Sequence, residues 1–377
     1  MPLDRLEVRV SIQKVLLGLI IVIVPLSIIG LYLTTRTDTA LNQSIGTQFK
    51  TLAGIYGNEV FEFFHDRVSD VATIAMDPVL VDGVLSADRG YEGQSESAIA
   101  AKIDKMRKSW SAPAFAGAAV KSILGSKSSE VLTRHHEINP LLLRLTATDE
   151  RGITVGSTTQ VMRYSYSDNE GWQSAYASGK GAVTVSPILY DDLAKAYYVN
   201  IGVPVTEPGS GRLAGVLSAA VNVSTLLSRF QQPQTGSGAK LLLVNEDGTI
   251  ISGPGADVFA RVRSKEFSAI GDSIGPVRGK ENGYVVANLG AGPTIIGFAD
   301  LGLKPHFSNL AWTVIVSQEK SAATASIQPV IRFALLMVLL GMLLVILLAV
   351  YYSIHKKQQF ADIEEALPPD IISPHAV

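Results

Sequence analysis

The segment LLLRLTAT (residues 141–148), DERG (149–152) and ITVGSTT (153–159) decides the fold of this chain. Its outer parts are apolar and prone to β-structure, and the four residues between them are polar and end on a glycine. Two such runs around a short turn that contains glycine are typical of a β-hairpin. The sequence therefore predicts an antiparallel strand pair at the centre of the chain.

The same pattern returns further along, as LLLV (241–244), NEDG (245–248) and TIIS (249–252), with glycine again closing the turn. Each hairpin is followed by a second predicted strand pair: residues 196–205 with 213–223, and residues 293–299 with 311–317. A repeated unit of this length indicates two related modules in tandem. Because the strands pair mostly in sequential order, we expect an α+β fold with antiparallel sheets and helices on their faces.

A long helix is predicted over residues 36–78, where apolar side chains recur at spacings of three to five. The pattern breaks at Met76-Asp77-Pro78, as expected where proline ends a helix. A helix of this length spans about 60 Å, which is more than one small domain covers. We therefore expect a homodimer through this helix, with packing wholly on its own chain as the alternative. The stripe consists of Leu41, Ile45, Phe49, Leu52, Tyr56, Val60, Phe63, Val68, Val71 and Ala75.

Two uncharged apolar runs flank this region and account for much of a composition that is 47% hydrophobic and only 18% charged. Runs of about 20 apolar residues are long enough to cross a bilayer. We predict transmembrane helices at residues 15–34 and 332–354. A cleaved signal peptide is the alternative for the first run, but the run is longer than a usual signal peptide core and no clear small-residue cleavage site follows it.

The charges beside these runs predict the orientation. Arg5, Arg9 and Lys14 precede the first run, and Lys356-Lys357 follow the second. Since basic residues favour the cytoplasmic side, residues 1–14 and 355–377 are expected inside the cell and the region between the two spans outside it, with lipid around both spans. The net charge of −2 gives no indication of nucleic-acid binding, and the chain has no cysteine for a disulfide.

This order of elements resembles the double Cache (dCache) sensor domain, the extracellular PAS-like input of bacterial chemoreceptors, sensor kinases and cyclic-di-GMP enzymes. The resemblance covers most of residues 36–325. It implies a membrane-distal module over 79–230 that holds a ligand between its sheet and a lid of loops, and a membrane-proximal module over 236–325. It also implies a place in the inner membrane of a bacterium. The segments that carry it are 148–152, 166–168 with Trp172, 186–187, 190–192, 202–205, 213–217, 244–248 and 312–316.

The candidate ligand contacts lie mainly between residues 160 and 192, which are rich in aromatic and acidic side chains. A small-molecule site needs aromatic walls and a few polar anchors. Amino-acid-binding members of the family have Arg-x-Trp-Tyr, then Tyr-x-Asp, then a later aspartate. Ordinary packing between helix and sheet is the alternative for each residue. The predicted contacts are Tyr166, Asp168, Trp172, Tyr190, Asp192 and Asn222.

The departures from this family pattern bear on the ligand. Glu170 stands where the arginine would bind a carboxylate, and Asn222 stands where the later aspartate would bind an amine. We therefore expect a cationic or neutral small molecule in place of a standard amino acid. Arg163 would support an anion if its side chain pointed inward.

Catalysis finds no support in the sequence, which lacks nucleophile-elbow, Walker, HExxH and dinucleotide-binding motifs. We expect no enzyme activity, no cofactor and no metal, and we interpret His135-His136 as a surface pair. The tail 355–377 is too short for an output domain. The expected function is therefore a sensor that signals through a separate cytoplasmic or membrane partner. A solute-binding accessory protein of a transporter and a receptor that has lost its output domain are the alternatives.

Overall fold

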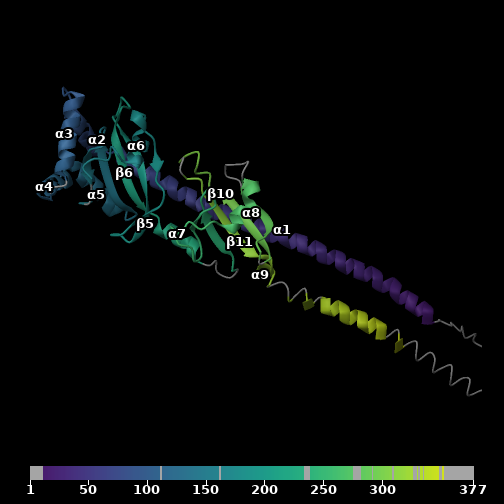
Figure 1. Ribbon diagram of the computed structural model, residues 1–377. Coiled ribbons are helices and arrows are strands. Elements are labelled where there is room, and N and C mark those ends of the chain that lie inside the picture. The colour runs from purple at the N-terminus through teal and green to yellow at the C-terminus, as the bar shows by residue number, and fades with distance from the viewer. Residues whose placement is uncertain are drawn as a thin grey trace, which may run out of the picture. The chain divides into compact units, whose positions relative to one another are not determined.

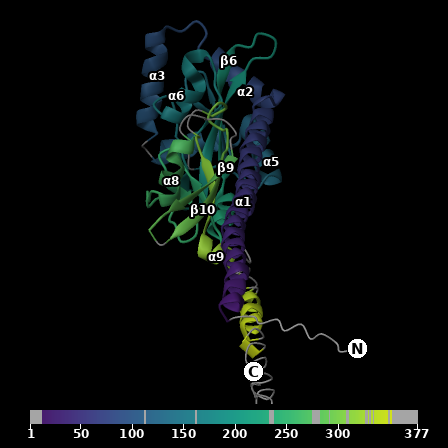
Figure 2. The ribbon, with the colours of Figure 1, turned by 90° about the vertical axis from the view of Figure 1, so that its right-hand side faces the viewer.

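The computed structural model describes residues 12–110, 113–160, 163–232, 238–274, 282–290, 292–307, 310–325, 329, 332–333, 335–347 and 350–351. The chain divides into two compact units, one of residues 1–45 with 320–377 and one of residues 46–319. The unit 46–319 contains both β-sheets and most of the helices that cover them (Figures 1 and 2).

The expected membrane spans are only partly described. The backbone of helix α1 (Ile12–Ala75) includes residues 15–34, whereas residues 332–354 are described in part and the tail 355–377 lies outside the described residues. Within the part of the chain that the structure describes, no helix combines the length and the apolarity needed to cross a membrane. The two-pass topology therefore stays a prediction.

The break predicted at residues 76–78 is the junction between α1 and α2 (Pro78–Arg89). Asp77 caps the new helix, since its Oδ1 accepts hydrogen bonds from the N–H of Val79 at 2.8 Å and of Leu80 at 3.3 Å. Pro78 occupies the first turn of α2, where an N–H would have no partner within the helix. The Asp-Pro pair thus ends one helix and starts the next.

Within the unit 46–319, helix α1 buries its apolar stripe against its own chain. At Gly297 on strand β10 (Pro293–Asp300) the approach is so close that an added β-carbon would overlap the backbone of Phe49 and Lys50. Glycine is required here because only it lets the helix backbone rest directly on the strand. Of the predicted stripe, Phe49, Val60, Val71 and Ala75 are buried, whereas Leu52, Tyr56, Phe63 and Val68 are half-buried. Ala53, Phe64 and Ile74, which are outside the predicted stripe, are also buried.

Three further helices precede the first sheet: α3 (Glu96–Ser109), α4 (Pro113–Leu124) and α5 (Lys127–Ile138). Ser95 and Ser126 cap α3 and α5 through their side-chain oxygens. Helices α2 and α5 lie on one face of the sheet, in contact with strands β1 (Leu142–Asp149) and β2 (Thr154–Ser157).

The first sheet has the strand order β2-β1-β6-β5-β3, and the short strand β4 (Leu189–Asp191) also pairs with β5. All its pairings are antiparallel. The predicted hairpin is β1–β2, closed by Gly152 at φ +75°. The face of this sheet opposite to α2 and α5 is covered by helix α6 (Glu170–Tyr176), which contacts β3, β5 and β6 and is followed by the turn Ala177–Gly179. The remaining strands are β3 (Thr184–Val185), β5 (Ala196–Thr206) and β6 (Leu213–Asn222).

The second sheet repeats this order as β8-β7-β11-β10-β9 and is again antiparallel. Helix α7 (Ser224–Gln231) leads into it, and helix α8 (Lys265–Ile274) covers the face away from α1. These observations confirm the predicted α+β fold, with a long N-terminal helix and two tandem antiparallel sheets. The strands are β7 (Lys240–Val244), β8 (Ile250–Ser252), β9 (Asn282–Asn288), β10 and β11 (Thr313–Glu319), and β11 is followed by α9 (Lys320–Thr324).

Candidate functional site

The two faces of the first sheet carry different side chains. Successive residues of a strand point to opposite faces, so Leu145 and Ala147 of β1 face α2 and α5 and are fully buried. Thr148 points the other way, because its Oγ1 accepts the indole N–H of Trp172 on α6 at 2.8 Å. Strand register places the side chains of β5 and β6 that face α6 beside those of β1. We call this the α6 face: Arg144, Thr146, Thr148, Tyr198, Asn200, Gly202, Val216, Ser218, Ala220 and Asn222.

The second sheet has an apolar lining at the equivalent face. Its side chains close into one buried cluster with Ile270 of helix α8, and partly buried apolar residues fill the edges of that cluster. The α6 face of the first sheet differs in having polar side chains at its middle, and this difference makes it the candidate site. The apolar cluster of the second sheet consists of Leu242, Val244, Ile270, Ile296, Phe298 and Ile315.

The middle of the α6 face holds Asn200, Ser218 and Asn222, all half-buried. No described residue forms a hydrogen bond with the side chain of Asn200 or Ser218. The amide of Asn222 uses only its Oδ1, which accepts the N–H of Ser224 at 2.9 Å. All three side chains are partly exposed, so water can reach them in the free protein and their remaining polar groups are not committed to partners within the fold. These side chains therefore offer donors and acceptors to a ligand.

A pair of opposite charges lies at one end of this row. Arg144 Nη1 lies 3.3 Å from Asp191 Oδ2, and the guanidinium sits 5.7 Å from the ring centre of Tyr198. Hydrogen bonds from the N–H groups of Ala194 and Leu193, together with Arg144, lower the pKa of Asp191. The carboxylate is thus ionised at neutral pH, and the pair presents one cation and one anion without a net charge.

The other end of the α6 face is aromatic. The rings of Trp172 and Tyr176 stack with centroids 4.8 Å apart and 11° between their planes. Trp172 is only 7% exposed, and Tyr166 packs against the same cluster. Asn169 fixes the start of α6, since its Oδ1 accepts the N–H of Trp172 at 3.1 Å. The face thus combines an apolar wall with a polar row, as small-molecule sites do.

The structure separates the six predicted contacts. Tyr166 and Trp172 lie at the aromatic end of the α6 face, and Asn222 lies at its polar end. Asp168 instead forms an exposed ion pair with Arg163 at 2.9 Å, so Arg163 does not point inward. Glu170 is exposed at the start of α6.

The other two predicted contacts lie elsewhere. Tyr190 pairs in register with Tyr197 and shares its side of β5, which is opposite to the α6 face. Asp192 is exposed and lies 3.7 Å from Lys195. In the Tyr-x-Asp stretch it is therefore the middle residue, Asp191, that reaches the α6 face. Side chains alternate between the two faces along a strand, and this alternation is the sequence signal that separates Asp191 from Tyr190 and Asp192.

Sequence reasoning missed Arg144, Asn200 and Ser218, which sit inside strands that were read only as structural. A polar residue alternating with apolar ones in a central strand is a usable signal, because a central strand is normally buried on both faces of a covered sheet. A polar residue of this kind indicates a candidate ligand contact where its side chain faces the interior without a partner.

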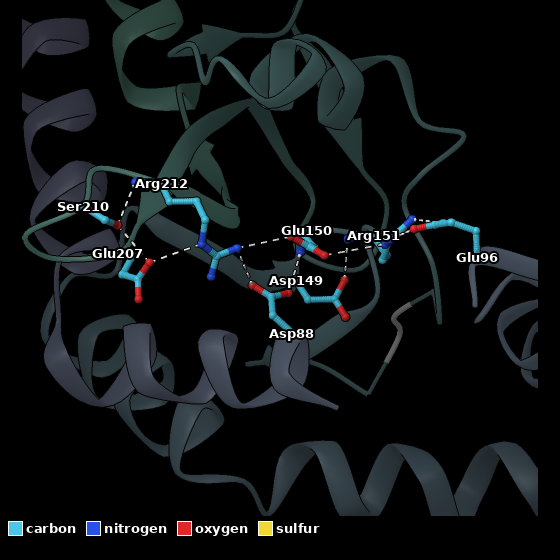
Figure 3. A network of polar contacts seen from close by, with 8 residues as sticks. All are labelled: Asp88, Glu96, Asp149, Glu150, Arg151, Glu207, Ser210 and Arg212. Carbon is cyan, nitrogen blue, oxygen red and sulfur yellow. Dashed lines mark hydrogen bonds and ion pairs between the residues drawn. The ribbon is translucent and has the colours of Figure 1, made fainter. Parts of the chain in front are cut away.

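A second polar group lies at the β1–β2 turn. Figure 3 shows a chain of contacts from Glu207 through Arg212 to Glu150, and from Arg151 to Glu96. The Arg212 guanidinium bonds Glu207 at 3.2 Å and Glu150 at 3.3 Å. These contacts join the β5–β6 loop, the β1–β2 turn and helix α3 into one surface network.

Asp88 of helix α2 lies beneath this network and is 7% exposed (Figure 3). Its Oδ1 accepts the N–H of Glu150 at 3.2 Å, and its Oδ2 is buried without a hydrogen bond, 4.0 Å from Arg212. Burial is the main cause that raises the pKa of Asp88 to about 7. Burial likewise raises the pKa of Asp149, whose Oδ2 accepts the hydroxyl of Tyr91 at 2.6 Å.

Comparisons with known proteins give one family and one fold. The sequence matches the dCache_1 family, described as a Cache domain, over residues 37–327. The sensory domain of the Campylobacter jejuni chemoreceptor Tlp3 (CcmL) is similar at a TM-score of 0.50 and 11% identity, over 77% of this chain and 99% of that one. The ligand-binding domain of the Pseudomonas fluorescens chemoreceptor CtaA, in complex with L-isoleucine, is similar at 0.47 and 12%, over 77% and 98%. No curated protein matches the chain.

Proposed function

The chain belongs to the double Cache sensor domain family, and from this premise we propose that it is a membrane-anchored extracytoplasmic sensor that binds a small molecule on the α6 face. One observation carries this proposal: the two sheets share a strand order, yet the second is lined by an apolar cluster and the first by unpaired polar side chains. Asn200 and Ser218 are half-buried and have no partner among the described residues, so water that bonds them in the free protein can be exchanged for a ligand.

The proposed ligand is a small polar molecule without a net charge, either neutral or zwitterionic, which replaces the cationic ligand that Glu170 and Asn222 led us to expect. The charges of Arg144 and Asp191 cancel, so a ligand with a net charge would leave one charge uncompensated in a half-buried place. In this proposal Asn200, Ser218 and Asn222 bond its polar groups, while Trp172 and Tyr166 contact its apolar part.

The direct test is thermal and chemical unfolding of the full chain in detergent, with a panel of amino acids, amines, carboxylates, sugars and purines. A ligand at 100 times its Kd raises the free energy of unfolding by about 2.7 kcal/mol. Asn200→Ala and Ser218→Ala should each weaken that effect, because each removes one partner. Asn288→Ala on β9 of the second sheet is the matched control, and it should respond to the ligand as the wild type does. Equal stabilisation of wild type, Asn200→Ala and Ser218→Ala would place the ligand elsewhere.

The membrane topology is part of this proposal and rests on the apolar runs 15–34 and 332–354 with their flanking charges. The chain has no cysteine, so an introduced thiol reports its own position without background. Ser210 lies in the exposed β5–β6 loop, and cysteine at this position should react with an impermeant maleimide on intact cells. Reaction only after lysis would contradict the two-pass topology.

A homodimer through α1 and a separate signalling partner complete the proposal. Ile55 is 57% exposed on a helix whose other side is buried, and we propose the contact with a second copy on this open side. Cysteine at position 55 should give a disulfide-linked dimer under mild oxidation, and a chain that stays monomeric would argue against this interface. Proximity labelling from the cytoplasmic side, with and without ligand, is the assay for the partner in the cytoplasm or membrane.

A further inference from the structure

A cavity lies at the junction of the two sheets, on the side of β5 opposite to the α6 face. Its volume is about 530 Å³, within the usual range of small-molecule sites. Strands β4 and β5 of the first sheet form one wall, helix α7 forms the floor, and the loop after β8 forms the second wall. All three elements belong to the unit 46–319.

Three aromatic rings from both walls meet in this cavity. Tyr190 and Tyr197 lie with ring centroids 5.1 Å apart at 61°, and Tyr197 and Phe259 lie 5.8 Å apart at 47°. Phe259 is 51% exposed and Tyr190 is 40% exposed, so both rings leave aromatic surface open. The tilted rings therefore present several π-faces and edges to the same space.

The charges around the rings favour a cationic guest. Asp257 lines the cavity, and no described residue forms an ion pair with it. Its Oδ1 accepts the N–H of Phe259 at 3.0 Å, so the carboxylate and the phenylalanine are held on one turn. Lys195 also lines the cavity, but its ammonium lies 3.7 Å from Asp192, which offsets its charge.

We propose that this junction cavity is a second small-molecule site, distinct from the α6 face, and that it takes an organic cation such as an alkylated amine. The face of an aromatic ring attracts a cation, and rings from different strands can surround one. Asp257 supplies the opposite charge. Since the walls come from both sheets, a bound cation would contact both modules at once.

The test is isothermal titration of the full chain in detergent with choline, and with 3,3-dimethyl-1-butanol as its uncharged isostere. Choline is expected to bind and the isostere to bind at least tenfold more weakly, because the isostere keeps the shape without the charge. Phe259→Ala should weaken choline binding by about 5- to 30-fold. Asp257→Asn should weaken it several-fold, with the effect shrinking as salt is raised.

The controls separate this site from the α6 face. Asn200→Ala and Ser218→Ala lie on the opposite side of the sheet and should leave choline binding unchanged. Thermal unfolding of each variant without ligand shows whether it is folded, and Asp257→Asn keeps the size of the side chain if Phe259→Ala is unstable. Absence of choline binding up to 10 mM, equal binding of the isostere, or loss of binding in Asn200→Ala would overturn the proposal. The first two outcomes leave the proposal for the α6 face untouched, whereas loss of choline binding in Asn200→Ala would place the cation on the α6 face and would also contradict an uncharged ligand there.

Discussion

Replacing Asp88 with asparagine should remove a pH dependence of stability that the buried carboxyl creates. Asp88 has an ordinary pKa of 3.8, and burial raises the pKa to about 7 in the folded chain. Between these values the folded state keeps a proton that the unfolded state has released. Stability is therefore fully present below pH 4 and falls as the pH rises towards 7.

The magnitude follows from the size of the shift. One pKa unit corresponds to about 1.4 kcal/mol, so the full shift amounts to a loss of at most about 4 kcal/mol by pH 8. Asparagine keeps an oxygen that accepts the N–H of Glu150 and cannot ionise. We expect Asp88→Asn to match the wild type at pH 4 and to be about 2–4 kcal/mol more stable at pH 8. Asp149 also has a raised pKa and contributes the same trend in both proteins.

The assay is denaturant unfolding of the full chain in detergent, followed by circular dichroism from pH 4 to pH 8.5. Asp82→Asn is the matched control on the same helix, because Asp82 is 77% exposed and paired with Arg89 at the surface. It should leave the pH profile unchanged. Parallel profiles for wild type and Asp88→Asn, or a less stable Asp88→Asn at pH 8, would refute the reasoning.

Substitutions at Gly297, Trp172 and Asp77, two of them with a second substitution for comparison, test local contacts of the fold in unfolding experiments. Gly297→Ala should cost about 1–3 kcal/mol, because its methyl group meets the backbone of α1; Gly271→Ala in helix α8, with open space around it, should instead be neutral or stabilising by up to about 1 kcal/mol. Trp172→Phe should cost about 1–3 kcal/mol through the lost hydrogen bond to Thr148, and an unchanged midpoint would mean that this bond contributes nothing. Asp77→Ala should cost about 1 kcal/mol by uncapping α2, and Asp77→Asn should restore most of it.

The fold was largely accessible from the sequence because its signals are local. The turns that end on Gly152 and Gly248 need positive φ angles, which glycine adopts without strain, so both hairpins are marked by a single residue type. The break at Asp77-Pro78 is equally local. The short strands β3 and β4 lack such signals, since a few residues between loops show no periodicity.

The candidate site was less accessible because it depends on which face each strand residue occupies. Tyr190 and Asp191 are neighbours in sequence, yet one lines the junction cavity and the other pairs with Arg144. A shift of the strand pairing by one residue moves every side chain of the strand to the other face. The register of β4 on β5 therefore decides which face Tyr190 and Asp191 occupy. The pairing of Asp168 with Arg163 is likewise a matter of loop geometry.

The repetition of one sheet with two different linings also has an evolutionary consequence. The chain contains the same strand order twice, so each position on the first sheet has an equivalent on the second. Selection would favour polar residues at some positions of the first sheet and apolar residues at their equivalents. Under the proposed function, a mutation from polar to apolar at Ser218 would weaken ligand binding, whereas a mutation from apolar to polar at Ile315 would bury a polar group without a partner in an apolar core. The two halves of the gene would therefore diverge fastest in composition at the positions where their backbones are most alike.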